Sequence, residues 1–237
     1  MNTRRSEPVS YGYVKISRSK VKMLIGAWLL ESLPKSQWEI VAPIMKKKEV
    51  PDVAKPVIKT IRNLGIGRAK LLDVGCSSGY YYDFFRWSKL RLDYCGCDVS
   101  PYFISLAKEK YPKIDFKVAP MSNLPYRNDS FCIVLASGVL HCDPDYERAI
   151  AELVRVSNRY ILLHRLPIFP ANSRSKISYY KKIGYGVEMM EVIFDFKTLN
   201  KIFKKLKIRT KHFETAGKMD IPDEAYWSTI LLEKKLS

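Results

Sequence analysis

The chain has 237 residues and a mass of 27.5 kDa, a length that favours one domain with a sizeable buried core. Lys and Arg number 41 against 24 Asp and Glu, so the formal net charge is +17, and 47% of the residues are hydrophobic. This composition excludes a disordered or fibrous protein. The excess of positive charge indicates an anionic partner without identifying it.

The first 62 residues predict an N-terminal helical cap. Helical patterns cover residues 21–33 and 53–64, and prolines at 34, 43, 51 and 56 interrupt them. The longest apolar run in this part, Met23 to Leu30, is far shorter than the roughly 20 residues that cross a bilayer. No small-residue cleavage site follows that run. We therefore expect neither a transmembrane helix nor a secretory signal, and we expect the cap to pack over the sheet of residues 63–237.

The five cysteines are an odd number and are scattered without a Cys-x-x-Cys pair. This pattern favours reduced thiols in a cytoplasmic protein, with no metal site and no disulfide.

From about residue 70, short apolar runs alternate with helical patterns, which is typical of βαβ units. We expect strands at residues 70–74, 92–97, 114–118, 131–136, 160–164, 209–214 and 227–233. Helices are expected at residues 80–87, 101–110, 146–156 and 196–206. Residues 166–188 contain two prolines and two glycines and predict a long functional loop on the acceptor side. The prediction is an α/β fold: a Rossmann-like, seven-stranded, mostly parallel sheet with helices on both faces.

A buried strand ends at Val74 and runs into a turn that contains Gly75 and Gly79. In open α/β sheets, ligands bind at the carboxyl ends of the strands, where glycine lets the backbone approach closely. Ser77 occupies the middle of the turn, so the full Gly-x-Gly-x-x-Gly fingerprint is absent, and no Gly-Lys-Ser/Thr follows as in a P-loop. Asp73 lies in this strand, directly before Val74. Asp98 ends the next one, at a position suited to accept hydrogen bonds from two ribose hydroxyls.

Four segments in order resemble class I S-adenosylmethionine-dependent methyltransferases of the type 11 methyltransferase-domain group. Residues 73–79, DVGCSSG, match the family's first motif except that Ser77 replaces the middle glycine. Residues 97–100, CDVS, match the second motif, and residues 123–134 and 138–156 resemble the third and fourth. The resemblance covers roughly residues 70–165 in motif detail.

The resemblance implies S-adenosylmethionine as the cofactor. The cofactor-binding residues that it implies are Asp73, Gly75, Cys76, Ser77, Ser78, Gly79, Asp98, Val99, Ser100, Met121, Ser122, Ser137 and Gly138. Family members usually carry an acid where residues 119–122 stand here as APMS. Because no carboxylate lies there, we expect Met121, its backbone and the Ser122 hydroxyl to hold the adenine. Gln37 and Trp38 are expected to close over the methionine end.

Methyl transfer from a sulfonium uses an activated donor, so the protein mainly supplies proximity, orientation and a dry pocket. A general base is needed only if the acceptor must lose a proton. The candidate bases are His141 and Asp143 after the fourth strand and His164 at the end of the fifth. The alternative is that each histidine is a structural residue satisfied by backbone hydrogen bonds.

The expected reaction is methylation, at oxygen or carbon, of a small-molecule or glycan-like acceptor that carries negative charge, for which Arg165 is a candidate contact. A phosphorylated or carboxylated molecule and a glycolipid at a membrane surface are both compatible. The alternative is an RNA methyltransferase or RNA-binding protein that uses the basic surface. Nucleic acid is not favoured, because the lysines of residues 196–206 form one face of an amphipathic helix without interleaved aromatics. A cofactor-binding regulator without catalytic activity is a third class.

Overall fold

The computed structural model describes residues 11–221 and 223–234. Within these residues the chain forms a sheet of ten strands, so the prediction of a seven-stranded sheet is wrong in its count. None of the helices in this part of the chain has the length and apolar character that crossing a membrane requires.

All seven predicted strands are present. They are β2 (Ala69–Val74), β3 (Leu92–Asp98), β4 (Asp115–Val118), β5 (Phe131–Ser137), β6 (Ser157–Phe169), β9 (Ile208–Lys218) and β10 (Tyr226–Lys234). Their order is β4-β3-β2-β5-β6-β10-β9, with β2 to β6 parallel and β10 antiparallel to both of its neighbours. The mostly parallel, Rossmann-like α/β fold is confirmed.

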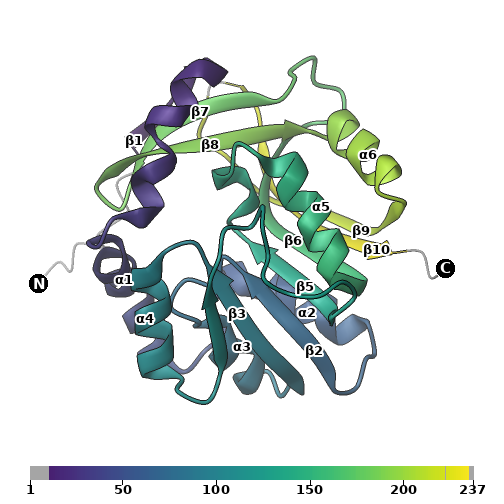
Figure 1. Ribbon diagram of the computed structural model, residues 1–237. Coiled ribbons are helices and arrows are strands. Elements are labelled where there is room, and N and C mark those ends of the chain that lie inside the picture. The colour runs from purple at the N-terminus through teal and green to yellow at the C-terminus, as the bar shows by residue number, and fades with distance from the viewer. Residues whose placement is uncertain (1–10, 222, 235–237) are drawn as a thin grey trace, which may run out of the picture.

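Three further strands extend the sheet past the end of β6. These are β1 (Tyr11–Ile16), β7 (Ser178–Gly184) and β8 (Val187–Asp195), which cross above the parallel strands in Figure 1. Strands β1, β7 and β8 pair antiparallel, and β8 joins the last two residues of β6 in parallel.

The predicted loop at 166–188 is therefore wrong, because most of it is strand. Its glycines mark a tight turn: β7 and β8 are joined by Tyr185 and Gly186 alone, both with positive φ (52° and 80°), as in a two-residue hairpin turn.

The N-terminal segment is only partly helical. It contains β1, then the 3-10 helices η1 (Arg18–Met23) and η2 (Ile25–Leu29), the helix α1 (Leu33–Lys47), the turn η3 (Asp52–Ala54) and the helix α2 (Lys55–Asn63). The expectation of a wholly helical segment is corrected at β1, which pairs with β7. Pro34 and Pro43 do not separate helices: Pro34 lies in the first turn of α1, where no backbone donor is needed, and Pro43 lies inside α1. A boundary near residue 62 stays a prediction, and residues 1–10 lie outside the described part.

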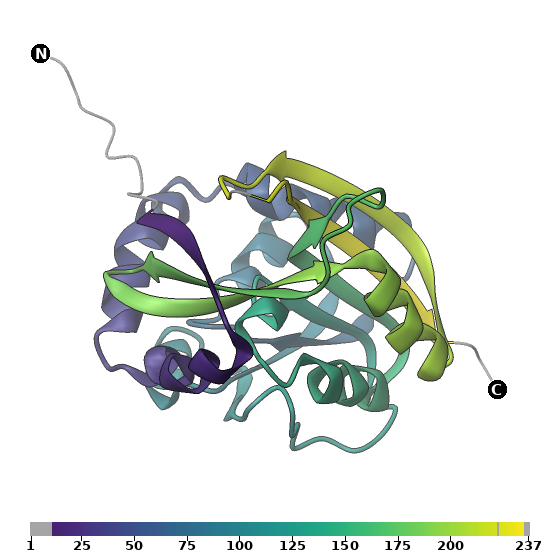
Figure 2. The same ribbon diagram turned by 90° about the horizontal axis from the view of Figure 1, so that it is seen from above.

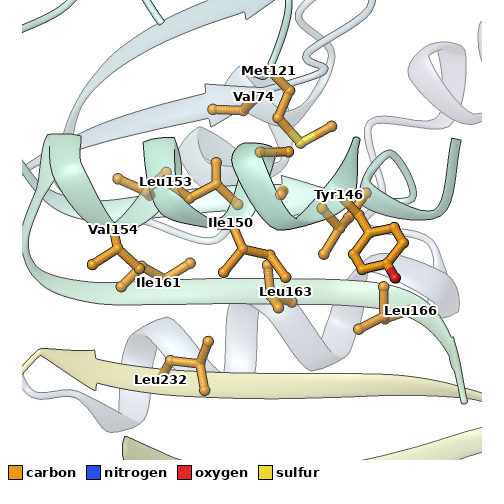
Figure 3. Packing of buried hydrophobic residues seen from close by; sticks show 14 of the residues in the cluster. Val74, Met121, Tyr146, Ile150, Leu153, Val154, Ile161, Leu163, Leu166 and Leu232 are labelled. Atoms are coloured by element: carbon orange, nitrogen blue, oxygen red, sulfur yellow. The ribbon is translucent and has the colours of Figure 1, made fainter. Parts of the chain in front are cut away.

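The helices after β2 agree closely with expectation: α3 (Tyr81–Trp87), α4 (Pro101–Lys110), α5 (Tyr146–Val156) and α6 (Phe196–Lys205), with the short turn η4 (Leu140–Cys142) before α5. Side chains of the central strands alternate between the two faces. One face packs against α2, α3 and α4, and the other against α5 and α6. Figure 1 shows α5 and α2 on opposite sides of the sheet. In Figure 3, Ile150, Leu153 and Val154 of α5 lie against Ile161 and Leu163 of β6.

Candidate functional site

A cavity of about 400 Å³ opens at the carboxyl ends of β2, β3 and β5. Of the predicted cofactor-binding and catalytic residues, its wall contains Gly75, Ser77, Asp98, Val99, Met121, Ser122, Ser137, Gly138 and Asp143. The remaining predicted residues, Asp73, Cys76, Ser78, Gly79, Ser100, His141 and His164, do not form part of the wall. Most of the predicted site residues therefore line the cavity, and the others lie outside its wall.

The glycine turn after β2 is held against β3. The backbone N–H groups of Gly75 and Cys76 both donate to the carbonyl of Cys97, at 2.8 and 3.0 Å. Gly75 has a φ of +72°, and a Cβ added to it would lie 2.4 Å from Cγ2 of Val139. A side chain at this position would therefore be strained and would close the space between the turn and the loop that follows β5.

Asp98 connects the turn to the next helix. Its Oδ2 accepts a hydrogen bond from the backbone N–H of Ser77, and its Oδ1 accepts one from the N–H of Ser100, each at 2.9 Å. Burial raises the pKa of Asp98, while the N–H groups of Ser100 and Ser77 oppose that shift. The carboxylate is partly buried, lies in the cavity wall and keeps lone pairs that hydroxyl groups of a ligand can use.

Ser77 also links the turn to the N-terminal segment, because its hydroxyl donates to Oε1 of Gln37 in α1. Gln37 is part of the cavity wall. Its closing over the methionine end of the cofactor stays a prediction. Trp38 is not part of that wall. The ammonium of Lys110 lies 3.5 Å from the centre of its ring, outside the cavity.

Asp73 is buried next to the glycine turn and is not part of the cavity wall. Its side chain is 1% exposed, and Oδ2 accepts a hydrogen bond from the hydroxyl of Tyr94 at 2.7 Å. Burial raises the pKa of Asp73 to about 7, against the effect of the Tyr94 hydrogen bond. Ser100 has a related role, since its side chain caps α4 by accepting from the N–H of Phe103.

His164 does not face the cavity. Its Nε2 lies 2.7 Å from the carbonyl of Val53, and its Nδ1 lies 2.8 Å from the hydroxyl of Thr229. Burial lowers the pKa of His164 to about 4, so the ring is neutral, Nε2–H donates to Val53 and Nδ1 accepts from Thr229. This arrangement fastens η3 to the sheet and matches the structural alternative given for this residue.

His141 belongs to a buried ionic cluster behind the wall. Its Nε2 lies 3.4 Å from Oε1 of Glu191, and the carboxylate of Glu191 also contacts the ammonium of Lys182 and accepts from the hydroxyl of Tyr13 at 2.8 Å. Burial alone would lower the pKa of His141, but the neighbouring Cys142 and Glu191 raise it to about 9. Burial would raise the pKa of Glu191, yet His141 and Lys182 hold it at about 2. His141 is therefore paired with a buried carboxylate outside the cavity wall, a position unsuited to take a proton from a ligand in the cavity.

Asp143 is the one residue among the three candidate bases that reaches the cavity. Burial raises the pKa of its carboxyl group, partly offset by a hydrogen bond from the backbone N–H of Asp145. Cys142 also lies in the wall, next to the buried cluster.

The remaining wall includes Arg165 of β6, which was expected as an acceptor contact, and residues that were expected only as part of a helical cap or a loop. The latter include Ile25, Trp28 and Leu29 of η2, Ile40, Val41 and Ile44 of α1, and Tyr185 of the β7–β8 turn, and Tyr80 and Tyr81 at the start of α3 complete this part of the wall. The hydroxyls of Tyr81 and Ser137 lie 2.9 Å apart, which anchors one ring beside the end of β5. In the sequence, the apolar run Met23 to Leu30 is the signal that could have indicated the contacts made by η2.

Comparison with known proteins agrees with this geometry. Residues 72–159 match a family model described as "Methyltransferase domain". Over 100 residues the chain is 31% identical to a phthiotriol/phenolphthiotriol dimycocerosates methyltransferase of Mycobacterium tuberculosis, covering 41% of this chain and 37% of that relative. The chain thus matches well under half the length of the curated relatives.

Two solved structures share the fold over more of the chain. An S-adenosylmethionine-dependent methyltransferase from Methanosarcina mazei has a TM-score of 0.60 and 19% identity, covering 75% of this chain and 98% of that one. A 1,6-didemethyltoxoflavin-N1-methyltransferase from Burkholderia thailandensis has a TM-score of 0.59 and 16% identity, covering 99% of both chains. Residues 72–159 are therefore similar to a methyltransferase domain, and the chain has the fold of the class I S-adenosylmethionine-dependent methyltransferases.

Proposed function

We propose that this protein binds S-adenosylmethionine in the cavity and transfers its methyl group to a small-molecule acceptor. The observation that carries the proposal is the joint placement of the Gly75 turn and the Asp98 carboxylate at one end of the cavity. The turn has space because Gly75 lacks a Cβ, and Asp98 has acceptor capacity next to it.

The wall residues fit the parts of that cofactor. Asp98 would accept from the ribose hydroxyls, since it is an anionic acceptor held rigid by two backbone donors. Val99, Met121 and Ser122 would hold the adenine, with an apolar surface and one hydroxyl in place of the acid common in this family. Gly75, Ser137 and Gly138 would surround the methionine portion.

The bound cofactor would supply an activated methyl group on a sulfonium. The chain's own residues would then have to orient the acceptor and exclude water, which is the main requirement of this reaction. The aromatic and apolar wall residues, Tyr80, Tyr81 and Trp28 among them, suit that task. Asp143 is the candidate base for an acceptor that must lose a proton, because its carboxylate lies in the wall and its pKa is raised.

The acceptor would lie between the cofactor site and the N-terminal segment. Arg165 is exposed, lies in the cavity wall and stacks over the ring of Trp227 at 5.4 Å. It would bind a carboxylate or phosphate group of the acceptor. The similar proteins named above act on phthiotriol/phenolphthiotriol dimycocerosates and on 1,6-didemethyltoxoflavin, as their names state, which supports a small-molecule acceptor. The second of them is an N1-methyltransferase, so methylation at oxygen or carbon is our proposal for this chain alone.

A transfer assay tests the proposal. The protein is incubated with S-adenosylmethionine labelled in its methyl group and with a cell extract divided into lipid, small-molecule and RNA fractions. We expect label in a small-molecule or lipid product, loss of that label with Asp98→Asn, and no loss with Asp93→Asn. Asp93 lies on the same strand but outside the cavity, in a surface ion pair with Arg68. Label in the RNA fraction would instead support the RNA methyltransferase alternative, and label in no fraction would contradict the proposal.

A further inference from the structure

Several large apolar side chains that line the cavity, or neighbour its lining residues in the sequence, are open to solvent. We call the set of Met23, Ile25, Leu29, Leu30, Ile40 and Val53 the apolar rim. Each member is at least 43% exposed, and Met23 reaches 85%. Ile25, Leu29, Ile40 and Val53 also belong to the cavity wall, so the exposed apolar surface continues into the cavity.

Single exposed apolar residues are ordinary, but a group of them around one opening indicates a surface that another body covers. The rim is built from η1, η2, α1 and η3, and the Gln37–Ser77 hydrogen bond joins α1 to the glycine turn. It is therefore a defined surface of the fold, and α1 connects it to the proposed cofactor site. Figure 2 shows the purple and blue N-terminal helices side by side along one flank of the molecule.

The same segments carry an excess of positive charge. Residues 17–50 contain seven basic and three acidic residues. Exposed cations in this part of the chain are Arg18, Lys20, Lys35, Lys46, Lys47 and Lys48. Within residues 11–221 and 223–234, none of these six forms an ion pair.

Helix α1 combines the two properties. Ile40, Ile44 and Lys47 recur at intervals of four and three residues, so they lie along one side of the helix. That side starts at the cavity wall and ends in the run Lys46 to Lys48 at the end of α1. Apolar side chains bordered by lysines are the arrangement found in helices that lie in the interface of an anionic bilayer.

We propose that the apolar rim docks on an anionic lipid bilayer and that the acceptor enters the cavity from that bilayer by its apolar part. Met23 and Leu30 insert among the acyl chains near the headgroups, and Lys46 to Lys48 contact lipid phosphates. The statement about the acceptor rests on the proposed function, but the docking surface does not. The cations of residues 17–50 and the apolar rim would then both serve to bind the bilayer.

Vesicle flotation tests the docking surface directly. The probes are vesicles of phosphatidylcholine alone and of phosphatidylcholine with about 30% phosphatidylglycerol. We expect the full chain to float with the anionic vesicles, to float much less with the neutral ones, and to lose binding as salt rises. Met23→Ser/Leu30→Ser should lower the partition coefficient at least about tenfold. Lys46→Gln/Lys47→Gln should lower it about fivefold for each lysine.

Matched controls lie elsewhere on the surface. Phe213→Ser removes a 40% exposed aromatic ring in β9, and Lys197→Gln/Lys201→Gln removes two exposed lysines of α6. Both should bind vesicles like the parent. Because Met23 and Leu30 lie outside the cavity wall, their variant should keep its S-adenosylhomocysteine affinity and its unfolding curve.

Three results would overturn the proposal: absence of binding to anionic vesicles, equal binding to neutral ones, or equal losses in the control variants. If light scattering shows a dimer that the rim variant dissociates, and no vesicle binding occurs, the rim is an interface between two copies. Vesicle binding without S-adenosylhomocysteine binding would refute the proposed function and leave the docking surface standing.

Discussion

At Gly75 the absence of a side chain is itself part of the site. The residue has a positive φ, its N–H donates to the Cys97 carbonyl, and the side chain of Val139 occupies the direction in which a Cβ would project. Backbone conformation and close packing both require glycine here. The turn can therefore approach a ligand only while this position stays small.

Gly75→Ala should destabilise the fold by about 2 kcal/mol or more, because a positive φ and a close contact are both penalised. It should also abolish binding of S-adenosylhomocysteine. Gly67→Ala is the matched control, since a Cβ at Gly67 meets nothing within 4 Å, and it should stay within about 0.5 kcal/mol of the parent. Urea denaturation and calorimetric titration measure the two effects. Unchanged affinity in Gly75→Ala would show that the turn does not contact the ligand.

At the scale of elements, the buried cluster around Glu191 joins η4 to β8, β7 and β1. His141 and Lys182 supply positive charge, and Tyr13 donates a hydrogen bond to the same carboxylate. A histidine whose pKa is raised by folding stabilises the native state fully below its unfolded pKa of about 6.5, and that contribution is lost as the pH rises. The loss is complete above the folded pKa of about 9.

His141→Gln should therefore cost most stability at or below about pH 6.5. Its disadvantage relative to the parent should shrink by about 3.5 kcal/mol as the pH rises from 6.5 through 9, because 1 unit of pKa corresponds to roughly 1.4 kcal/mol. Urea unfolding of both proteins across this range measures the difference. A constant difference between parent and His141→Gln would mean that His141 is not charged in the native protein.

The β7–β8 hairpin depends on a turn in which two successive residues adopt positive φ. A Cβ at Gly186 would meet nothing within 4 Å, so a substitution there tests backbone conformation alone. Gly186→Val should destabilise the protein by about 1 to 2 kcal/mol. Gly186→Asn should cost less, because asparagine tolerates this conformation. Equal costs for the two variants, measured by urea unfolding, would contradict the turn assignment.

The same hairpin is a part of the fold that the sequence did not predict. Continuous apolar runs predicted the strands from β2 to β6 because both faces of those strands are buried. Strands β7 and β8 lie among prolines and glycines that also suit a loop, and their pairing with each other, with β1 and with the end of β6 distinguishes the two. Tertiary contacts of this kind leave no local signal.

The site shows a similar division. The glycine turn, Asp98 and the residues after β4 and β5 were predicted, because the carboxyl ends of parallel strands meet at one edge. The direction of a side chain was not predicted: His141 follows β5 and His164 lies in β6, but both side chains are buried and outside the cavity wall. Apart from Gln37, the wall contributed by η2 and α1 was also missed, because its place beside the strand ends depends on contacts between distant segments, such as the Gln37–Ser77 hydrogen bond.

At the scale of the whole molecule, the positive charge is not uniform in its role. The lysines of α6 lie on an exposed face opposite the buried Leu199 and Phe203, which agrees with an ordinary amphipathic helix. The cations of residues 17–50 lie beside the apolar rim instead. If RNA were the ligand, its affinity should fall steeply with salt, because each phosphate contact releases counterions. Removal of the Met23 and Leu30 side chains would leave RNA affinity unchanged.

The central claim is that the cavity binds S-adenosylmethionine through Asp98 and the Gly75 turn. Calorimetric titration of S-adenosylmethionine into the parent protein, Asp98→Asn and Asp93→Asn tests it most directly. We expect saturable binding to the parent and to Asp93→Asn, and an affinity at least about tenfold lower for Asp98→Asn, because a charged hydrogen bond contributes about 1.5 to 3 kcal/mol. Absence of binding to the folded parent, or equal affinity in all three proteins, would contradict the account.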